Sequence, residues 1–504
     1  MSDLHVLVID DSENWQEALP DILQRLADNV QVDVAPTYDI ALQFVNNKTY
    51  DLATVDMSLL GDVLDDQLGL DLLQEFRDDP RQEGCGLVVV SNYPTPENIL
   101  RSLREHGAHD FIEKDQFDDE QFLEVGRAAI LNARLRQATI KASARYSLTI
   151  NFNLSSLVGS ELAGPNLRSI HAADHPQQFN ATDLVRRADN LNLYVLHENA
   201  DLWRSEARSI GQELYHILTG DRRILGDLAS AQALAERSYD LWLRFRGPAI
   251  SLGTPFELLR DGNDALVLKH ILTHAWIQPG FSRKPGLFHR FLRDLYQDQQ
   301  TLRILVVGAN SDGYIPAAEQ EAHLIAESLK RNLQCLGIAH KVTLLSGPDA
   351  TCTNVSQALQ QDGYHLFHYA GHGRFSDQLP EVSDLVLQDG VLTAADLNLL
   401  VSDTPLRFVF LSCCLGSRTA AGVGRGDFHG MLEALARADI PIVLGYRWTV
   451  ADTPAMDLAL DFYHTLWRTF SPGEALLQAR RNIARKYGLD DDTWAAPVLL
   501  MQNQ

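Results

Sequence analysis

The stretch Tyr364–Arg374 reads YHLFHYAGHGR, and with Arg407–Gly416, which reads RFVFLSCCLG, it decides the fold. Each begins with a short apolar and aromatic run, which predicts a buried strand, and ends in small residues, which predict a tight turn. The first turn would present His372 and the second a cysteine thiol. Loops at the carboxyl ends of parallel strands line one edge of an open sheet, so the sequence predicts an α/β domain in which these side chains can meet.

A thiol beside an imidazole is the chemistry of a catalytic nucleophile. A thiol is only a few per cent ionised at neutral pH, and an adjacent imidazole raises that fraction and can protonate a leaving amine. Glycines flank His372, so the backbone N–H groups of Gly373 and Cys414 could stabilise an oxyanion. Taken alone, a cysteine after a buried strand is more often a small hydrophobe, and a histidine in a glycine turn is more often a turn residue.

The segments Tyr369–Gly373 and Leu411–Cys414 resemble the His-Gly and Leu-Ser-x-Cys motifs of the CHAT family, caspase-like cysteine peptidases of the separase and caspase clan. By motif position Cys414 is the nucleophile and His372 its partner, and no cofactor is expected for the peptidase. Cys413 stands where the family usually has a small residue. Further segments that resemble the family, over roughly residues 200 to 502, are Pro255–Asp261, Leu302–Gly308, Trp448–Asp452 and Trp494–Ala496. Leu302–Gly308 is predicted to be a strand.

Asp452 is the candidate substrate-binding residue. It follows a predicted strand at Ile440–Gly445, so it should leave the sheet at the same edge as His372 and Cys414. The segment around it resembles that of separase, in which the matching acid binds an arginine before the scissile bond, and the resemblance therefore implies cleavage after a basic residue. The alternative is that Asp452 caps a helix that begins near Thr453.

Residues 1–118 form a second pattern, in which strand-like and helix-like segments alternate as in a five-stranded doubly wound sheet. Five polar residues stand at the ends of its predicted strands: Asp10, Asp11, Asp56, Ser91 and Lys114. Three carboxylates in one crevice would repel one another unless they held a divalent cation, and oxygen ligands suit Mg²⁺. A hydroxyl and an ammonium group beside them could hold a phosphoryl group.

This constellation resembles the receiver domain of two-component response regulators, which implies a flavodoxin-like (βα)5 fold and a histidine kinase or other phosphodonor as partner. The resemblance assigns the roles by motif position: phosphoacceptor, Asp56; Mg²⁺ ligands, Asp10, Asp11 and Asp56; phosphoryl contacts, Ser91 and Lys114; switch aromatic, Phe111. The alternative is an ordinary flavodoxin-like domain with acidic strand ends. Two departures bear on the switch: Asp115 replaces the usual proline, and the loop Met57–Gln67 is long and acidic.

The remaining chain divides into a connecting helix at 119–146, a preceding half at 147–292 and a catalytic half at 293–504. The helix is expected to be a spacer, with a homodimer as an alternative use. The preceding half has mixed α+β signals and sits where the clan often has a catalytically silent half. Its predicted elements are strands at Leu148–Leu154, Leu191–Leu196 and Asp240–Phe245, a helix at Leu202–Leu218, and a Pro/Gly/Asn-rich region at Gly159–Asn180. In the catalytic half a hairpin is predicted around Asp389-Gly390.

Composition narrows the partners. The 504 residues carry a net charge of −24, which argues against nucleic acid and anionic membranes as partners. No signal peptide or long apolar run is evident, which favours a cytoplasmic protein. Five scattered cysteines predict no disulfide framework. His365, His368 and His372 do not predict zinc, because residues 365 and 368 of a strand point to opposite faces.

The sequence therefore favours a phosphorylation-regulated cysteine endopeptidase that cleaves a protein substrate. The alternative from another functional class is a non-catalytic signalling scaffold whose caspase-like half binds a partner.

Overall fold

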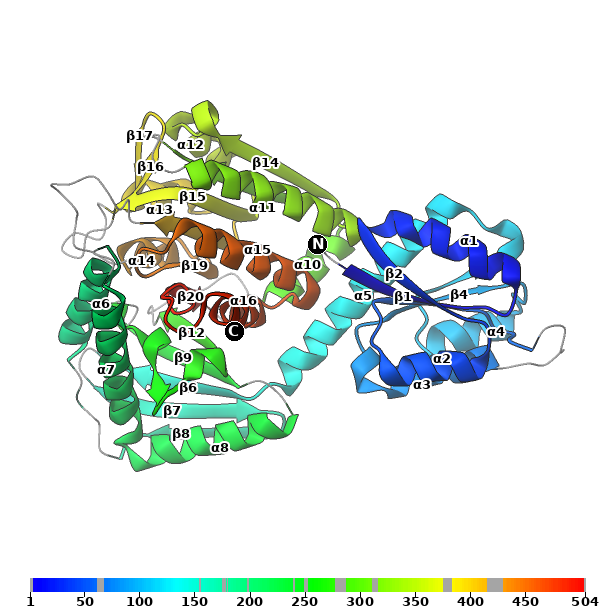
Figure 1. Cartoon of the computed structure of the whole chain (residues 1–504), viewed down its shortest axis with the longest axis horizontal. Helices are drawn as coiled ribbons and strands as arrows, with labels where there is room; N and C mark the ends of the chain where they lie inside the picture. Colours follow the sequence, from blue (N-terminus) through cyan, green and yellow to red (C-terminus); the bar gives the residue numbers. More distant parts are fainter. Residues whose placement is uncertain are drawn as a thin grey trace. The chain divides into compact units, whose positions relative to one another are not determined.

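The computed structural model describes residues 3–60, 68–153, 156–174, 178, 180–196, 199–238, 241–248, 253–276, 287–310, 316–374, 383–414 and 429–502. They form two compact units, each containing helices packed on a sheet (Figure 1). The first unit comprises Met1–Ile140 together with Lys330–Ala339 and Trp467–Phe470. The second comprises Lys141–Leu329, His340–Leu466 and Ser471–Gln504.

The first unit has a parallel sheet of five strands in the order β2-β1-β3-β4-β5. Its strands are β1 (Asp3–Ile9), β2 (Asn29–Ala35), β3 (Leu52–Val55), β4 (Gly86–Ser91) and β5 (Asp110–Glu113). Its helices are α1 (Glu13–Leu23), α2 (Tyr38–Asn47), α3 (Leu68–Asp78), α4 (Pro96–Leu100), continued by a π-type turn at Arg101–Glu105, and α5 (Asp119–Ala144). This confirms the predicted doubly wound fold. Every residue of β3 and β4 is buried, as expected for parallel strands covered on both faces.

The second unit is built on one mixed sheet of 13 strands. The main path runs β14-β13-β15-β18-β19-β20-β12-β9-β6-β7-β8, and the hairpin β16–β17 attaches to β15. The strands are β6 (Ser147–Phe152), β7 (Leu157–Gly164), β8 (Leu167–Ala172), β9 (Trp242–Gly247), β12 (Ile271–Trp276), β13 (Leu302–Gly308), β14 (His340–Ser346), β15 (Leu366–Arg374), β16 (Asp384–Leu387), β17 (Gly390–Thr393), β18 (Phe408–Cys414), β19 (Ile442–Tyr446) and β20 (Pro497–Met501). A separate two-stranded ribbon pairs β10 (Arg260–Asp261) with β11 (Asp264–Ala265).

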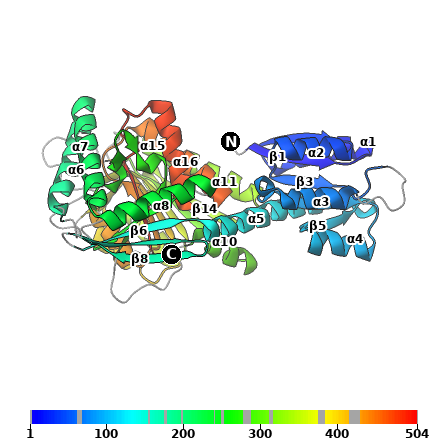
Figure 2. The ribbon, with the colours of Figure 1, turned by 90° about the horizontal axis from the view of Figure 1, so that it is seen from below.

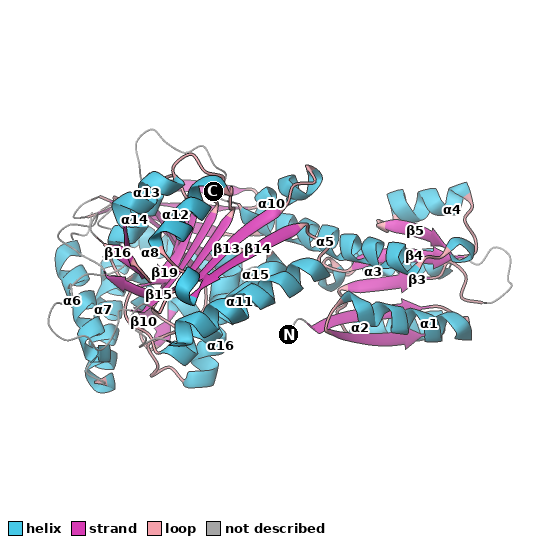
Figure 3. Ribbon diagram, turned by 90° about the horizontal axis from the view of Figure 1, so that it is seen from above, coloured by secondary structure: helices cyan, strands magenta, loops and turns pink. Residues whose placement is uncertain are grey.

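Helices cover both faces of this sheet (Figure 3). They are α6 (Ala181–Leu196), α7 (Ala200–Thr219), α8 (Arg222–Ser238), α10 (Phe288–Gln297), α11 (Pro316–Cys335), α12 (Cys352–Gln361), α13 (Ala394–Val401), α14 (His429–Arg437), α15 (Asp452–Thr469) and α16 (Pro472–Tyr487). Odd-numbered residues of β15 and β18, such as Phe367 and Val409, enter a core with α12, α13 and α14. Even-numbered residues lie on the other face, where His368 contacts Glu321 of α11 and Tyr463 of α15.

The predicted hairpin is confirmed, because Leu387 of β16 pairs with Gly390 of β17. Three expectations were wrong. Leu191–Leu196 is the end of α6 rather than a strand, because the buried positions Leu184, Ala188 and Leu191 recur with helical spacing. β18 continues through Cys414, whereas Cys413 and Cys414 were expected in the turn after the strand, because both residues pair with the end of β15. Finally, β15 continues to Arg374 instead of ending in a turn before His372, because its last two residues pair with β16.

Candidate functional site

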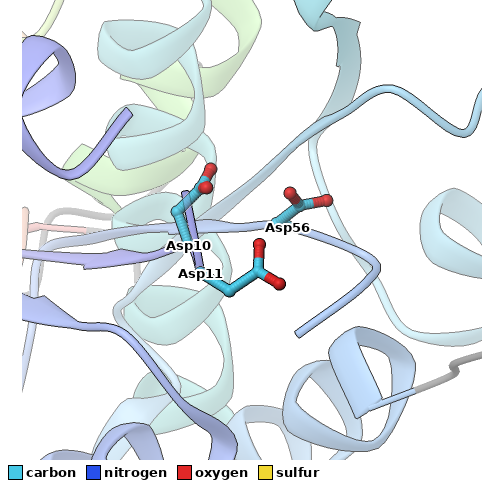
Figure 4. Close-up of side chains that lie close together, drawn as sticks. All are labelled: Asp10, Asp11 and Asp56. Carbon is cyan, nitrogen blue, oxygen red and sulfur yellow. The ribbon is translucent and has the colours of Figure 1, made fainter. Parts of the chain in front are cut away.

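An acidic cluster lies at the carboxyl edge of the first sheet. Asp10 follows β1, Asp56 follows β3, and the carboxylates of Asp10, Asp11 and Asp56 lie near one another (Figure 4). One oxygen from each lies within 4.8 Å of the others. The cluster sits where strand order reverses between β1 and β3, the usual place for a ligand crevice in an open parallel sheet.

Two further predicted residues complete this cluster. The Lys114 ammonium, which directly follows β5, lies 2.7 Å from Asp10 Oδ2 and 2.5 Å from Asp56 Oδ2. Ser91 Oγ donates to Asp56 Oδ1 at 2.6 Å. Burial raises the pKa of Asp10 to about 6, with Asp56 adding to the rise and Lys114 opposing it. All five polar residues that the sequence singled out therefore converge around Asp56.

The donor set fits Mg²⁺. Three carboxylates supply hard oxygen ligands, and two of them belong to Asp10 and Asp56, whose side chains are almost fully buried. A divalent cation would offset the repulsion between Asp10 and Asp56, which adds to the effect of burial on the pKa of Asp10. Among the described residues, this is the one group of three His, Cys, Asp or Glu side chains close enough to hold a metal ion.

Sequence reasoning missed an aromatic support beneath the lysine. The ring of Trp15 lies 5.4 Å from Lys114 Nζ and packs edge-on against Phe117, with the ring centroids 4.9 Å apart. Neither residue belongs to a short motif, so only the packing of α1 against the segment between β5 and α5 reveals them. Phe111, the predicted switch aromatic, is half-buried against the core of the unit. Of the long acidic loop, residues 61–67 lie outside the described residues.

The second candidate site lies on β15 and β18. These neighbouring parallel strands pair in a register that runs from Leu366 opposite Phe408 to His372 opposite Cys414. The backbone positions of the two predicted catalytic residues are thus direct partners, although 42 residues separate them in the chain. The position of the Cys414 thiol lies outside the described residues. The preceding Cys413 is buried in the core on the α12–α14 face.

The backbone around His372 is held tightly. The Tyr369 hydroxyl lies 2.8 Å from the carbonyl oxygen of His372 and 2.7 Å from that of Val386, within hydrogen-bonding distance of both. Gly371 is required beside it, because a Cβ there would lie 2.6 Å from that same hydroxyl. Gly373, the predicted oxyanion donor, sits opposite Leu385 of β16. These contacts hold the backbone of β15 in place around His372.

Asp452 is the first residue of α15, and the structure brings it near His372. Desolvation raises the pKa of its carboxyl, Glu321 raises it further, and His372 acts in the opposite direction. The carboxylate therefore lies in the electrostatic reach of the histidine, as the prediction of a common sheet edge requires. Because α15 begins at Asp452 itself, Ala451 occupies the cap position, and its carbonyl accepts the first helical hydrogen bond from Ala455.

Beneath this edge lies a buried group that the sequence did not indicate. His368 is fully buried, with Nδ1 3.2 Å from the Tyr463 hydroxyl and Nε2 3.3 Å from a Glu321 carboxylate oxygen. His365 instead accepts a hydrogen bond from the backbone N–H of Arg303, and burial lowers its pKa to about 4. His365 and His368 thus have separate surroundings.

The remaining family motifs are structural. Glu257 is completely buried, accepts from Arg447, and lies with its Oε1 2.6 Å from His274 Nε2. Trp448 and Trp494 are also buried, and each indole N–H donates to a backbone carbonyl. These residues tie the segment before Asp452 to the strands of residues 147–292.

The chain thus combines two features: an acidic cluster with a serine and a lysine at the edge of a doubly wound sheet, and a second sheet that pairs a histidine with a cysteine. This combination is typical of a signalling protein with a peptidase-like domain. Comparison with family models agrees. The response regulator receiver domain matches residues 6–125, and the CHAT domain matches residues 208–502. The chain belongs to the CHAT-domain family and carries an N-terminal receiver domain, as its motifs predicted. A receiver domain implies a phosphodonor as partner.

Solved structures that match include response regulators and receiver domains. The CheY-like receiver protein of Methanospirillum hungatei JF-1 is 24% identical, covering 26% of this chain and 97% of that one, with a TM-score of 0.23. A response regulator from Thermotoga maritima is 26% identical, covering 25% and 98%, with a TM-score of 0.22. The receiver domain of NtrX from Brucella abortus is 29% identical, covering 25% and 97%, also with 0.22.

No curated protein matches the chain. Within the described parts of the chain, no helix combines the length and apolar character needed to cross a membrane.

Proposed function

We propose that this chain is a cysteine endopeptidase of two-component signalling, controlled by phosphorylation of Asp56. The observation that carries the proposal is the strand register that pairs His372 with Cys414 inside a CHAT domain. In this proposal the chain divides into a receiver domain (1–118), a connecting helix (119–146), a catalytically silent half (147–292) and a catalytic half (293–504).

The proposed reaction uses the dyad in two steps. Cys414 gives its proton to His372, and the thiolate attacks the carbonyl carbon of the scissile peptide bond. The resulting oxyanion is stabilised by the backbone N–H groups of Gly373 and Cys414. The imidazolium protonates the leaving amine as the C–N bond breaks, which leaves a thioester. His372 then removes a proton from water, the hydroxide attacks the thioester, and the C–S bond breaks to restore the thiol.

Strand alternation supports Cys414 rather than Cys413 as the nucleophile. Successive strand residues face opposite sides of a sheet, and Cys413 packs into the core on the α12–α14 face. That leaves position 414 for the other face of the sheet, the face of the even-numbered residues of β15, and Asp452 lies within electrostatic reach of His372. A carboxylate near the histidine at this edge is suited to an arginine or lysine before the scissile bond, so we propose cleavage after basic residues.

In the receiver, Asp56 accepts the phosphoryl group, and Ser91 and Lys114 contact its oxygens. Both side chains already contact the Asp56 carboxylate. Mg²⁺ held by Asp10, Asp11 and Asp56 would offset the added negative charge when bound. A shift at this pocket would reach α5 through Phe111 and Phe117, since Phe117 packs on Phe122 of that helix.

The test is cleavage of a proteome-derived peptide mixture by the full chain treated with beryllofluoride and Mg²⁺. Wild type and Cys413→Ala should generate new N-termini, mainly after arginine and lysine, whereas Cys414→Ala and His372→Ala should generate none above background. If the wild type cleaves nothing under these conditions while still binding beryllofluoride, the scaffold alternative replaces the peptidase.

A further inference from the structure

A cavity rich in arginine lies on the sheet of residues 147–292, away from the two sites described above. Its volume is about 320 Å³, within the range of small-molecule binding pockets. Among its described lining residues the charged ones are four arginines and one glutamate: Arg145, Arg168, Arg244, Arg246 and Glu161. The whole chain carries a net charge of −24, so its composition does not lead one to expect four arginines around one cavity.

The side chains that line the cavity come from alternate positions of neighbouring strands. Trp242, Arg244 and Arg246 alternate along β9 with the buried Leu243 and Phe245. The neighbouring strand β6 places Ser147 opposite Trp242 and Thr149 opposite Arg244, so two hydroxyls line the same surface. On β7, Ser160 turns the other way and donates to Asp227 of α8. Figure 2 shows α8 along these strands, and this helix covers the face opposite the cavity.

Carboxylates and an aromatic ring lie beside these arginines. Arg168 pairs with Glu161 at 2.9 Å, Arg246 lies 3.9 Å from the same residue, and Arg145 pairs with Glu474. Two of the four guanidinium groups thus lie near the same carboxylate. The ring centroid of Trp242 lies 4.8 Å from Arg244 and 5.6 Å from Arg145. An aromatic ring orients a guanidinium group without cancelling its charge.

The electrostatics of Arg244 agree with this geometry. Burial lowers the pKa of its guanidinium to about 10, and the neighbouring Arg246 lowers it further, while Glu161 opposes them. The group remains protonated at neutral pH, but its charge is poorly solvated and is repelled by its neighbour. A bound anion would relieve both costs.

We propose that this cavity binds a small phosphorylated ligand with at least two negative charges, such as a diphosphate or a nucleoside diphosphate. Planar guanidinium groups match phosphate oxygens in bidentate fashion, and the hydroxyls of Ser147 and Thr149 are further donors. A small anion fits better than a nucleic acid, because the net charge of the whole chain repels an extended polyanion.

The test is calorimetric titration of the full-length chain with pyrophosphate and, separately, with ADP. Both are run in EDTA, so that the aspartate cluster of the receiver cannot bind phosphate through a metal ion. We expect one saturable site that weakens as NaCl is added, because the attraction is electrostatic. Tighter binding of ADP would identify a nucleotide as the ligand class, and equal binding would identify the phosphate groups alone.

Two variants locate the site. Arg244→Gln and Arg168→Gln should each weaken binding at least about tenfold, since each removes a charge-assisted contact. The side chain of Arg168 is 70% exposed, so its replacement leaves the packing intact even if Arg244→Gln perturbs the fold. The matched control is Arg222→Gln, an exposed arginine at the start of α8, which should bind as the wild type does. Absence of saturable binding in the wild type, or wild-type affinity in both pocket variants, would overturn the proposal.

Discussion

Asp452 is the residue whose proposed role is most open to measurement. It lies at the start of α15 within electrostatic reach of His372, where a carboxylate can receive a cationic side chain. Asp452→Asn keeps the size and removes the charge, so kcat/KM for a substrate with arginine before the scissile bond should fall about ten- to a hundredfold. For a matched substrate with glutamine there, the change should be small. An unchanged arginine-to-glutamine ratio would remove Asp452 from the specificity pocket.

The same residue predicts a pH dependence. Desolvation and Glu321 raise the pKa of the Asp452 carboxyl, so it takes up a proton at a higher pH than an ordinary aspartate. The protonated carboxyl no longer attracts a cation. Preference for arginine over glutamine should therefore decline as the pH falls, and in Asp452→Asn it should not change with pH.

At the residue scale, the sequence predicted site residues that belong to recognisable motifs. It did not predict residues that reach a site from a different helix or strand. The aspartates, Ser91 and Lys114 could be predicted because each stands at the end of a strand with a recognisable pattern. Trp15 and Glu321 could not, because they reach their sites from helices whose packing has no local signature. Tyr369 lay inside a predicted motif, but its hydrogen bonds depend on how β15 and β16 pair.

At the scale of elements, the buried group around Glu257 joins three parts of the second unit. Glu257 follows Pro255, His274 lies in β12, and Arg447 follows β19. Burial alone would raise the pKa of Glu257, but Arg447 and then His274 hold it at about 2. The depressed pKa means that the charged carboxylate stabilises the folded state. Its partner Arg447 lies in the segment that leads from β19 to Asp452.

Glu257→Gln should therefore lower the free energy of unfolding of this unit at pH 7 by on the order of 3 kcal/mol, because it leaves Arg447 buried without its partner charge. An ionised group with a depressed pKa contributes its stability above its unfolded pKa of about 4.3 and loses it as the pH falls towards 2. The deficit of the variant should thus shrink by roughly half a kcal/mol between pH 7 and pH 4, and further at lower pH. Urea denaturation at both pH values measures it.

Glu213→Gln is the matched control, since its ion pair with Arg187 is half exposed and should contribute less than about 1 kcal/mol. If the loss of stability in Glu257→Gln is no larger than that in the control, the buried group does not stabilise the unit more than a surface ion pair does.

Strands that are short apolar runs could be predicted from the sequence. Strands whose position depends on pairing with a neighbouring strand could not. Leu302–Gly308 was predicted to the residue because its apolar run stands between clear turn signals. β7 and β8 were not predicted, because Gly159 and Gly164 interrupt the apolar pattern of β7 and only the pairing of the strands, with Gly159 opposite Ala172, defines the hairpin. A Cβ at Gly159 would lie 2.3 Å from the carbonyl oxygen of His171.

At the scale of the whole molecule, the residues of α15 are divided between the two compact units. Trp467–Phe470, at and just after the C-terminal end of α15, belong to the unit that contains the receiver, whereas Asp452 is the first residue of the helix. Within the receiver unit, Arg134 of α5 donates to the carbonyl of Trp467 at 3.4 Å and to Asp51 at 2.8 Å. Asp51 immediately precedes β3, whose other end leads to Asp56.

This arrangement predicts coupling. Beryllofluoride with Mg²⁺, which imitates the phosphoryl group, should raise the peptidase rate at least about tenfold, and such a change requires only about 1.4 kcal/mol of differential stabilisation. Asp56→Ala should abolish the response while leaving Cys414 reactive towards a small thiol reagent. Equal rates with and without the mimic, in a preparation shown to bind it, would assign the receiver to localisation or partner recruitment.

The central claim is that Cys414 is the activated nucleophile, and labelling by an electrophilic peptide probe with arginine in its first position tests it most directly. After treatment with beryllofluoride and Mg²⁺, mass spectrometry should locate the adduct on Cys414 in the wild type and in Cys413→Ala. Cys414→Ala should carry no adduct, and His372→Ala should react far more slowly, because the thiol loses its base. An adduct on Cys413, or equal labelling of the wild type and Cys414→Ala, would contradict the account.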